Sequence, residues 1–311
     1  MTKKVFIDGK AGTTGLRIYE RLQNRHDIQQ VTLSEEDRKK PECRREMLNS
    51  CDIAFLCLPD DASREAVAMI DNPDVVVLDT STAHRTLDDW AYGFPELSPA
   101  FFQKIASSKR IAVPGCHASG FIALIRPLID AGIIGADALL TCHSLTGYSG
   151  GGKKMIAEYG DSARSVLFDA PRQYGLTQQH KHLKEMVKIT GCSTAPVFCP
   201  IVADYYSGML VTVPLFKAQL CGNSTVEDIR NVYRNLYNGK LVYYAEDASE
   251  SGLLAGNALS GNDAMQIMVE GNDDRILLLA RYDNLGKGAS GAAVECMNIV
   301  MGQAPETGLD L

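Results

Sequence analysis

Short apolar runs recur through residues 1–115, and stretches with helical spacing separate them. The predicted strands of this part are 5–8, 28–33, 53–58, 75–79 and 111–113, with a helix at 16–25 after the first strand. Continuous apolar strands separated by helices are typical of a parallel sheet that is buried on both faces. We therefore expect an α/β domain of the Rossmann type, with a doubly wound parallel sheet.

Residues 116–285 show a different pattern, in which helices and strands do not alternate regularly. The predicted strands are 139–144, 197–202, 208–214 and 276–283, and the predicted helices are 153–168, 182–190 and 225–237. This order favours an α+β domain with a mainly antiparallel sheet. A small-residue-rich stretch at 288–301 predicts a last helix, and we expect the C-terminal helix region 286–311 to complete the first domain.

Composition excludes some classes of protein. The chain has 311 residues, 45% of them hydrophobic, and this length allows about two domains. The net charge of −7 argues against general affinity for nucleic acid or anionic membranes. No apolar run reaches the roughly 20 residues of a membrane span, and the first strand begins too early to leave room for a signal peptide. Nine cysteines without CxxC or metal-site spacing predict free thiols, no metal and a cytoplasmic location.

A glycine-rich turn follows the first strand and precedes a helix. Its glycines, Gly9, Gly12 and Gly15, form a GxxGxxG pattern. Such a loop gives a tight turn and lets a pyrophosphate approach the backbone at the helix N-terminus. Thr13 and Thr14 add hydroxyl donors. We expect a dinucleotide site; the alternative is an ordinary glycine-rich turn.

The segment 34–40 leaves the choice of dinucleotide open. An acidic residue at the end of the second strand would bind a ribose hydroxyl and favour NAD. Ser34 with Arg38 or Lys39 would instead hold the 2′-phosphate of NADP.

Cys116 is the strongest catalytic candidate. Pro114 and Gly115 end a short strand, and an apolar helical pattern starts at Cys116. Unpaired N–H groups and the macrodipole at a helix N-terminus favour the thiolate, which is the nucleophilic form. The alternative is a buried structural cysteine.

Two histidines, His180 and His182, are candidates for the acid–base group. A neutral imidazole has an ordinary pKa near ~6.5, which suits proton transfer. At the start of a helix, residues two apart diverge by about 200°, so we expect only one ring to reach Cys116. His117 is expected to be a residue of the helix start without a catalytic role.

Several segments together resemble the semialdehyde dehydrogenases and, among them, the short-form N-acetyl-γ-glutamyl-phosphate reductases of arginine biosynthesis. The landmark segments are 9–15, 79–85, 92–96, 114–116, 147–152, 180–182 and 283–289. Gly115 stands where aspartate-semialdehyde dehydrogenases usually carry asparagine. The chain departs from the long-form reductases at His117 and Lys181, where an aromatic residue and arginine are usual.

The resemblance implies reduction of N-acetylglutamyl phosphate to N-acetylglutamate semialdehyde by NADPH, through a thioester on Cys116. It favours His182 as the acid–base group. It also implies an NADP-binding domain at 1–115 with 286–311, a catalytic and oligomerisation domain at 116–285, and a homodimer or homotetramer. Further catalytic or substrate-binding candidates are His180, Lys181, Ser149, Lys153 and Arg85, with Arg110 and Arg172 as additional cations for the acidic groups of the substrate. Lys287 and Gly288 are expected near the nicotinamide.

Three other functions remain open from the residues. An aspartate-semialdehyde or N-acetylaminoadipyl-phosphate reductase would differ only in the acyl pocket. A nucleotide-binding regulator without turnover would leave Cys116 and the two histidines without a role. A cysteine hydrolase would leave the glycine loop without one.

Overall fold

The computed structural model describes residues 2–311, which divide into two compact units. The first unit contains the chain up to Pro95, Pro99–Gly115 and Ala289–Leu309. The second contains Glu96–Ser98, Cys116–Gly288 and the last two residues. Cys116 is therefore the first residue of the main segment of the second unit.

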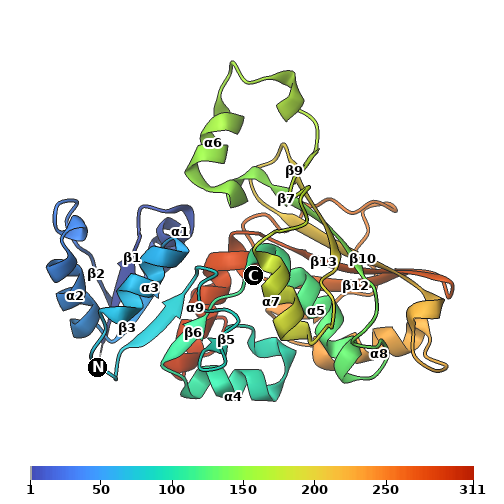
Figure 1. Ribbon diagram of the computed structural model, residues 1–311, viewed down its shortest axis with the longest axis horizontal. Coiled ribbons are helices and arrows are strands. Elements are labelled where there is room, and N and C mark those ends of the chain that lie inside the picture. Colours follow the sequence, from blue (N-terminus) through green and yellow to red (C-terminus); the bar gives the residue numbers. More distant parts are fainter. Residues whose placement is uncertain (1) are drawn as a thin grey trace. The chain divides into compact units, whose positions relative to one another are not determined.

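The first unit is built on a six-stranded sheet in the order β2-β1-β3-β4-β6-β5 (Figure 1). All five pairings are parallel. The strands are β1 (Lys3–Asp8), β2 (Ile28–Val31), β3 (Ile53–Leu56), β4 (Val76–Asp79), β5 (Ala91–Tyr92) and β6 (Arg110–Ala112). The helices are α1 (Thr13–Leu22), α2 (Pro41–Ser50), α3 (Asp60–Ala68), α4 (Pro99–Ser107) and α9 (Gly291–Val300).

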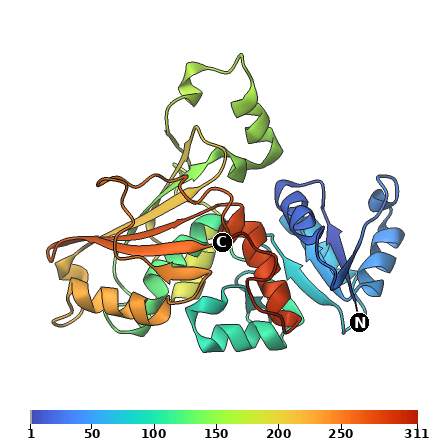
Figure 2. The ribbon, with the colours of Figure 1, turned by 180° about the vertical axis from the view of Figure 1, so that it is seen from behind.

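Alternate residues of the strands form two cores, one on each face of this sheet. Val5 and Ile7 pack with side chains of α1, α4 and α9. Phe6 points the other way and packs with side chains of α2 and α3. Because successive residues of a strand face opposite sides, both faces are buried, and the predicted doubly wound parallel sheet is confirmed. The two termini contribute to one face, where α1 contacts α9 (Figure 2).

The second unit is built on a seven-stranded sheet in the order β11-β12-β13-β10-β7-β9-β8. The pairs β7–β10, β10–β13, β12–β13 and β8–β9 are antiparallel, and β7–β9 and β11–β12 are parallel, so the predicted mainly antiparallel sheet is confirmed. The strands are β7 (Thr141–Gly147), β8 (Arg172–Gln173), β9 (Val197–Ala203), β10 (Met209–Phe216), β11 (Val242–Tyr244), β12 (Met265–Gly271) and β13 (Arg275–Tyr282). The helices are α5 (Cys116–Asp130), α6 (Gly152–Gly160), α7 (His182–Thr190) and α8 (Val226–Leu236).

Helices cover one face of this second sheet. Helix α5 packs against β10 and β13, α8 against β12, and α7 against α5. The segment that carries α6 leaves the sheet after β7 and returns at β8, and it projects from the ends of β7 and β9 (Figure 1). Among residues 2–311, no helix has the length and apolar character that crossing a bilayer requires.

Four predicted elements need correction. The helix predicted at 16–25 begins at Thr13, because Gly12 is its N-cap. The helix predicted at 153–168 ends at Gly160, and a separate 3₁₀ turn, capped by Ser165, follows it. The strand predicted at 139–144 lies at Thr141–Gly147. The helix predicted at 288–301 begins as a π-helical turn before α9.

Candidate functional site

The thiol of Cys116 stands at the first turn of α5, as the sequence predicts. A tyrosine from β13 enters this turn. The N–H of Gly120 donates to the Tyr282 hydroxyl (3.0 Å), which donates in turn to the Cys116 carbonyl (2.5 Å). A Cβ at Gly120 would lie 2.6 Å from Val211 Cγ2 and 2.7 Å from the Tyr282 hydroxyl. Only glycine lets the start of α5 sit this close to the sheet.

A cavity of about 220 Å³ opens beside Cys116. It lies within the second unit, and its lining includes Cys116, His117, Met155, Tyr174, His180, Lys181, His182 and Val202. Four side chains chosen from sequence motifs therefore share one cavity: the cysteine, both histidines and the lysine between them.

Both His180 and His182 line the cavity beside Cys116, and the expectation that only one of them reaches the thiol stays a prediction. Their ring centroids are 4.8 Å apart. Helix α7 begins only at His182, and His180 lies in the preceding turn, where its Nδ1 accepts the N–H of His182 (3.2 Å). This backbone contact turns the first ring back toward the second. Burial, and then the charge of Lys181, lower the pKa of His180.

His117 is held by two hydrogen bonds. Its Nδ1 lies 2.6 Å from the Ser144 hydroxyl, and its Nε2 lies 2.6 Å from the Tyr174 hydroxyl. Burial lowers the pKa of His117 to about 3, with His180 as a second cause. The ring is therefore neutral at pH 7 and orients Tyr174, whose own pKa is raised by burial and then by nearby Cys116. Sequence analysis missed Ser144 and Tyr174, since neither has a motif around it.

The segment 283–289 packs against the nucleophile. A Cβ on Gly288 would lie 3.0 Å from the Cys116 Cβ, so the main chain of Gly288 packs against the cysteine. Lys287 is buried and forms an ion pair with Glu96 (2.5 Å). Asn284 donates to the Ser149 hydroxyl (3.0 Å) and so holds the loop whose next glycines line the cavity.

The other predicted cations lie in different surroundings. Arg85 is buried in the first unit, where it donates to the carbonyls of Thr80 and Val113. Arg110 donates to the carbonyls of Val75 and Lys109. Lys153 is exposed on α6. Of the predicted cations Arg85, Arg110, Lys153 and Lys181, only Lys181 lines the Cys116 cavity.

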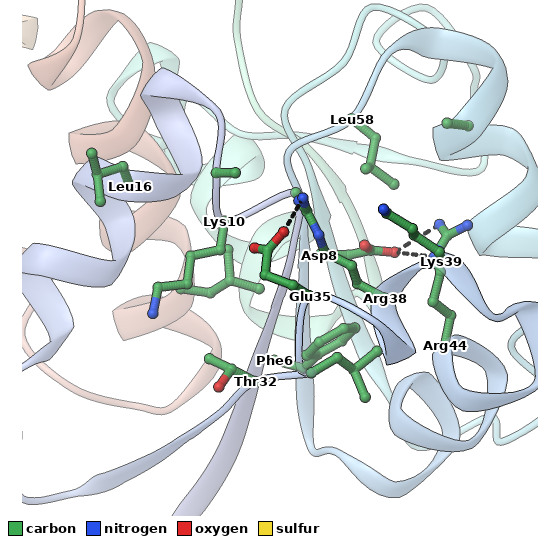
Figure 3. A pocket seen from close by; sticks show the side chains of 15 residues that line it. Phe6, Asp8, Lys10, Leu16, Thr32, Glu35, Arg38, Lys39, Arg44 and Leu58 are labelled. Carbon is green, nitrogen blue, oxygen red and sulfur yellow. Dashed lines mark hydrogen bonds and ion pairs between the residues drawn. The ribbon is translucent and has the colours of Figure 1, made fainter.

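The glycine loop forms one wall of a cavity of about 480 Å³ in the first unit (Figure 3). Gly9 has a φ of +85°, and a Cβ there would lie 2.2 Å from the carbonyl oxygen of Cys57. A Cβ on Gly15 would lie 2.6 Å from the carbonyl oxygen of Gly9. Gly12 caps α1 without a side chain, so the start of the helix stays open to a phosphate. Thr13 and Thr14 begin the helix and are not among the lining residues.

Cations line the far wall of the same cavity (Figure 3). Arg44 is paired with Asp8 (2.8 Å), and Arg38 is paired with Glu35. Lys39 also lines the cavity. Ser34 lies outside the lining, and its hydroxyl donates to Asp37 (2.8 Å) within its own turn. The volume, the glycine cradle and the cations fit a dinucleotide.

Comparison with known proteins agrees with this arrangement. A family model described as semialdehyde dehydrogenase, NAD binding domain, matches residues 34–105, and the semialdehyde dehydrogenase dimerisation domain matches residues 116–284. N-acetyl-gamma-glutamyl-phosphate reductase 2 of Nostoc sp. is 44% identical over 98% of this chain and 99% of its own length. The chain belongs to the N-acetyl-gamma-glutamyl-phosphate reductase family. The reductase of Rhizobium meliloti is 45% identical over 97% of this chain and 99% of its own.

Solved structures show the same fold at low identity. Aspartate semialdehyde dehydrogenase II of Vibrio cholerae superposes with a TM-score of 0.72 at 17% identity, over 97% of this chain and 98% of that one. The Francisella tularensis aspartate semialdehyde dehydrogenase has a TM-score of 0.73 at 14% identity, over 97% of this chain and all of that one. The resemblance drawn from the sequence motifs is confirmed.

Proposed function

We propose that this protein reduces N-acetylglutamyl phosphate to N-acetylglutamate semialdehyde with NADPH and releases phosphate, as a step of arginine biosynthesis. One observation carries the proposal. Cys116 at a helix N-terminus shares a cavity with His180, Lys181 and His182, in a chain 44% identical to a reductase of that name.

The first step is thioester formation. The Cys116 thiolate attacks the acyl carbon, the bond from carbon to the phosphate oxygen breaks, and phosphate leaves. Main-chain N–H groups at the start of α5 stabilise the oxyanion, each such donor being worth roughly 3 kcal/mol. Lys181 would neutralise the phosphate, which its exposure at the cavity and its lack of an acidic partner among residues 2–311 support.

The second step is reduction and release. When bound, the dinucleotide supplies the hydride. His182 donates a proton to the thiohemiacetal oxygen and recovers it as the carbon–sulfur bond breaks, which frees the aldehyde and the thiolate.

His182 suits this role better than His180. A neutral imidazole carries one proton, and Nδ1 of His180 already accepts the N–H of His182. The proton of His180 is then on Nε2, which leaves that ring no free nitrogen to act as a base. We assign His180 and Ser149 to positioning, and leave Lys153 and Arg85 as weaker substrate candidates because of the surroundings described above.

NADP is the proposed dinucleotide. Gly9, Gly12, Thr13, Thr14 and Gly15 would bind the pyrophosphate. Ser34 and Arg38 would bind the 2′-phosphate, and Lys39 supports this as a further cation of the cavity. Lys287 and Gly288 would contact the nicotinamide side, which the packing of Gly288 on Cys116 supports.

The assembly proposed is a homodimer or homotetramer that uses the sheet of the second unit. Its helix-free face exposes Val197 (56%), Phe216 (65%) and Leu277 (40%), and apolar side chains gathered on one sheet face favour association. All nine cysteines are free thiols, which supports a cytoplasmic location.

The reaction is best tested in reverse. N-acetylglutamate semialdehyde, phosphate and NADP⁺ should produce the absorbance of the reduced nicotinamide. Aspartate semialdehyde is the competing substrate, and a signal only with that compound contradicts the proposal. Cys116→Ser should abolish turnover and keep NADP⁺ binding. His182→Asn should lower kcat by about 100-fold, far more than His180→Asn, because it removes the acid–base group.

A further inference from the structure

Arg172 is a cation without a carboxylate partner among residues 2–311. Its Nε is buried and has no hydrogen-bond partner within residues 2–311. One terminal nitrogen donates to the Tyr159 hydroxyl (2.8 Å). The guanidinium carbon lies 3.8 Å above the Phe168 ring and 5.1 Å from the Tyr159 ring centre. The two aromatic rings thus fix the plane of the Arg172 guanidinium. No acidic side chain among residues 2–311 neutralises its charge.

A nearby arginine shows how differently this chain treats a structural guanidinium. Arg164 also approaches Tyr159, at 5.7 Å from the ring centre. It binds both Asp204 and Asp169, and these carboxylates raise its pKa. Arg164 is therefore neutralised by carboxylates of the protein. The charge of Arg172 has no such partner among residues 2–311 and can be neutralised by a bound anion.

Arg172 is not itself among the lining residues of the Cys116 cavity, but it is linked to two elements that line it. In the antiparallel pair of β8 and β9, Arg172 lies directly opposite Val202, which lines the cavity. Directly opposite residues point to the same face of a sheet, with Cβ atoms about 5 Å apart. On α6, the Tyr159 that binds Arg172 is one helical turn from the cavity residue Met155.

We propose that Arg172 binds the α-carboxylate of the substrate and so selects an amino-acid-derived acyl group. This inference rests on the proposed function. The substrate has two acidic ends, and four carbon–carbon bonds separate the reacting carbonyl carbon from the α-carboxylate carbon. Lys181 serves the phosphate end, and a planar guanidinium with unused donors is the group that binds a carboxylate through two parallel hydrogen bonds.

The test pairs a change in the protein with a change in the substrate. N-acetylglutamate semialdehyde and its α-carboxamide are compared as substrates of the wild-type protein, Arg172→Gln and Arg172→Lys. We expect the wild type to prefer the carboxylate by about 100-fold in kcat/KM, and Arg172→Gln to reduce this preference to under about threefold. The loss should appear in KM, and methylguanidinium should restore part of it. Arg172→Lys, which keeps the charge without the fork, should fall between the two.

Controls separate recognition from damage. Lys154→Gln removes an exposed charge from the same projecting segment and should keep the full preference. Arg172→Gln should also keep its affinity for NADP⁺ and its rate of Cys116 alkylation by iodoacetamide. If Arg172→Gln or, should that variant not fold, Arg172→Lys still discriminates as the wild type does, the carboxylate lies elsewhere. If the wild-type protein does not turn over the semialdehyde at all, the proposed function fails, and this inference with it.

Discussion

His117 is neutral and forms a hydrogen bond at each ring nitrogen. From this we predict how the stability of the protein depends on pH. The ring is buried between Ser144 and Tyr174, and its pKa is lowered to about 3. In the unfolded chain, the pKa returns to about 6.5. As the pH falls below that value, His117 becomes protonated in the unfolded chain but stays neutral in the folded protein. The stability contributed by this histidine is therefore complete above pH ~6.5 and is lost progressively down to the folded pKa.

The size of the effect follows from these two pKa values. Between pH 7 and pH 5, protonation of the unfolded imidazole alone lowers the free energy of unfolding by about 2 kcal/mol. His117→Gln removes the titrating ring. It should cost about 1–3 kcal/mol at pH 7, because the Ser144 and Tyr174 hydroxyls lose well-placed partners. It should then lose about 2 kcal/mol less than the wild type on acidification to pH 5.

Urea unfolding, followed by far-UV circular dichroism at pH 7, 6 and 5, measures this difference in slope. Ser144→Ala is the matched control, because it removes one partner of His117 and leaves the imidazole in place. It should lower stability at every pH and keep the wild-type slope. Parallel curves for the wild type and His117→Gln would refute the assignment of His117 as a buried neutral ring.

Three further predictions concern the two cavities. Gly9→Ala should destabilise the protein by more than about 3 kcal/mol and weaken NADP⁺ binding at least tenfold in a fluorescence titration, since strain and a backbone clash combine. Gly132→Ala, also at positive φ (+68°) but with nothing within 4 Å, should cost only about 1–2 kcal/mol in urea unfolding. Mass spectrometry after iodoacetamide at pH 7 should find Cys116 labelled and Cys57 unlabelled, because burial raises the pKa of Cys57 to about 12; equal labelling contradicts this. Tyr282→Phe should cost about 1–3 kcal/mol in urea unfolding, and an unchanged stability would mean that its hydroxyl does not anchor the nucleophile.

Apolar patterning predicted most of the sheets because buried strands need continuous or alternating apolar residues. The segment 53–56, buried at every position, is the clearest case. Helix α7 matches its predicted bounds, since Gly191 ends it in the left-handed conformation. Helix α2 went unpredicted, because it buries only Leu48 and its exposed face is strongly polar. A helix that packs on the sheet through Leu48 and the partly buried Met47 alone leaves little periodicity to detect.

Local motifs also predicted the reactive side chains of the Cys116 cavity, but not the residues that hold His117 in place. Cys116, His180 and His182 come from short segments with recognisable chemistry. Ser144 and Tyr174 belong to β7 and to the turn after β8, and the register of two strand pairings brings them to His117. Several arginines were equal candidates by sequence. Arg172 separates from Arg85 and Arg110 only when the partners of each guanidinium are known.

The grouping of three imidazoles beside one thiol has a physical consequence for catalysis. The centroids of His117, His180 and His182 lie 5.8 Å apart or less, so protonating one ring opposes protonation of the others. Burial already keeps His117 neutral, and Nδ1 of His180, the basic nitrogen of that ring, accepts the main-chain N–H of His182. We therefore assign the one added proton of the proposed cycle to His182. One proton is what the proposed cycle moves, from His182 to the thiohemiacetal oxygen and back. In the proposed complex, Lys181 and Arg172 would neutralise the acidic ends of the substrate, and these cations would also make a second proton on the rings unfavourable.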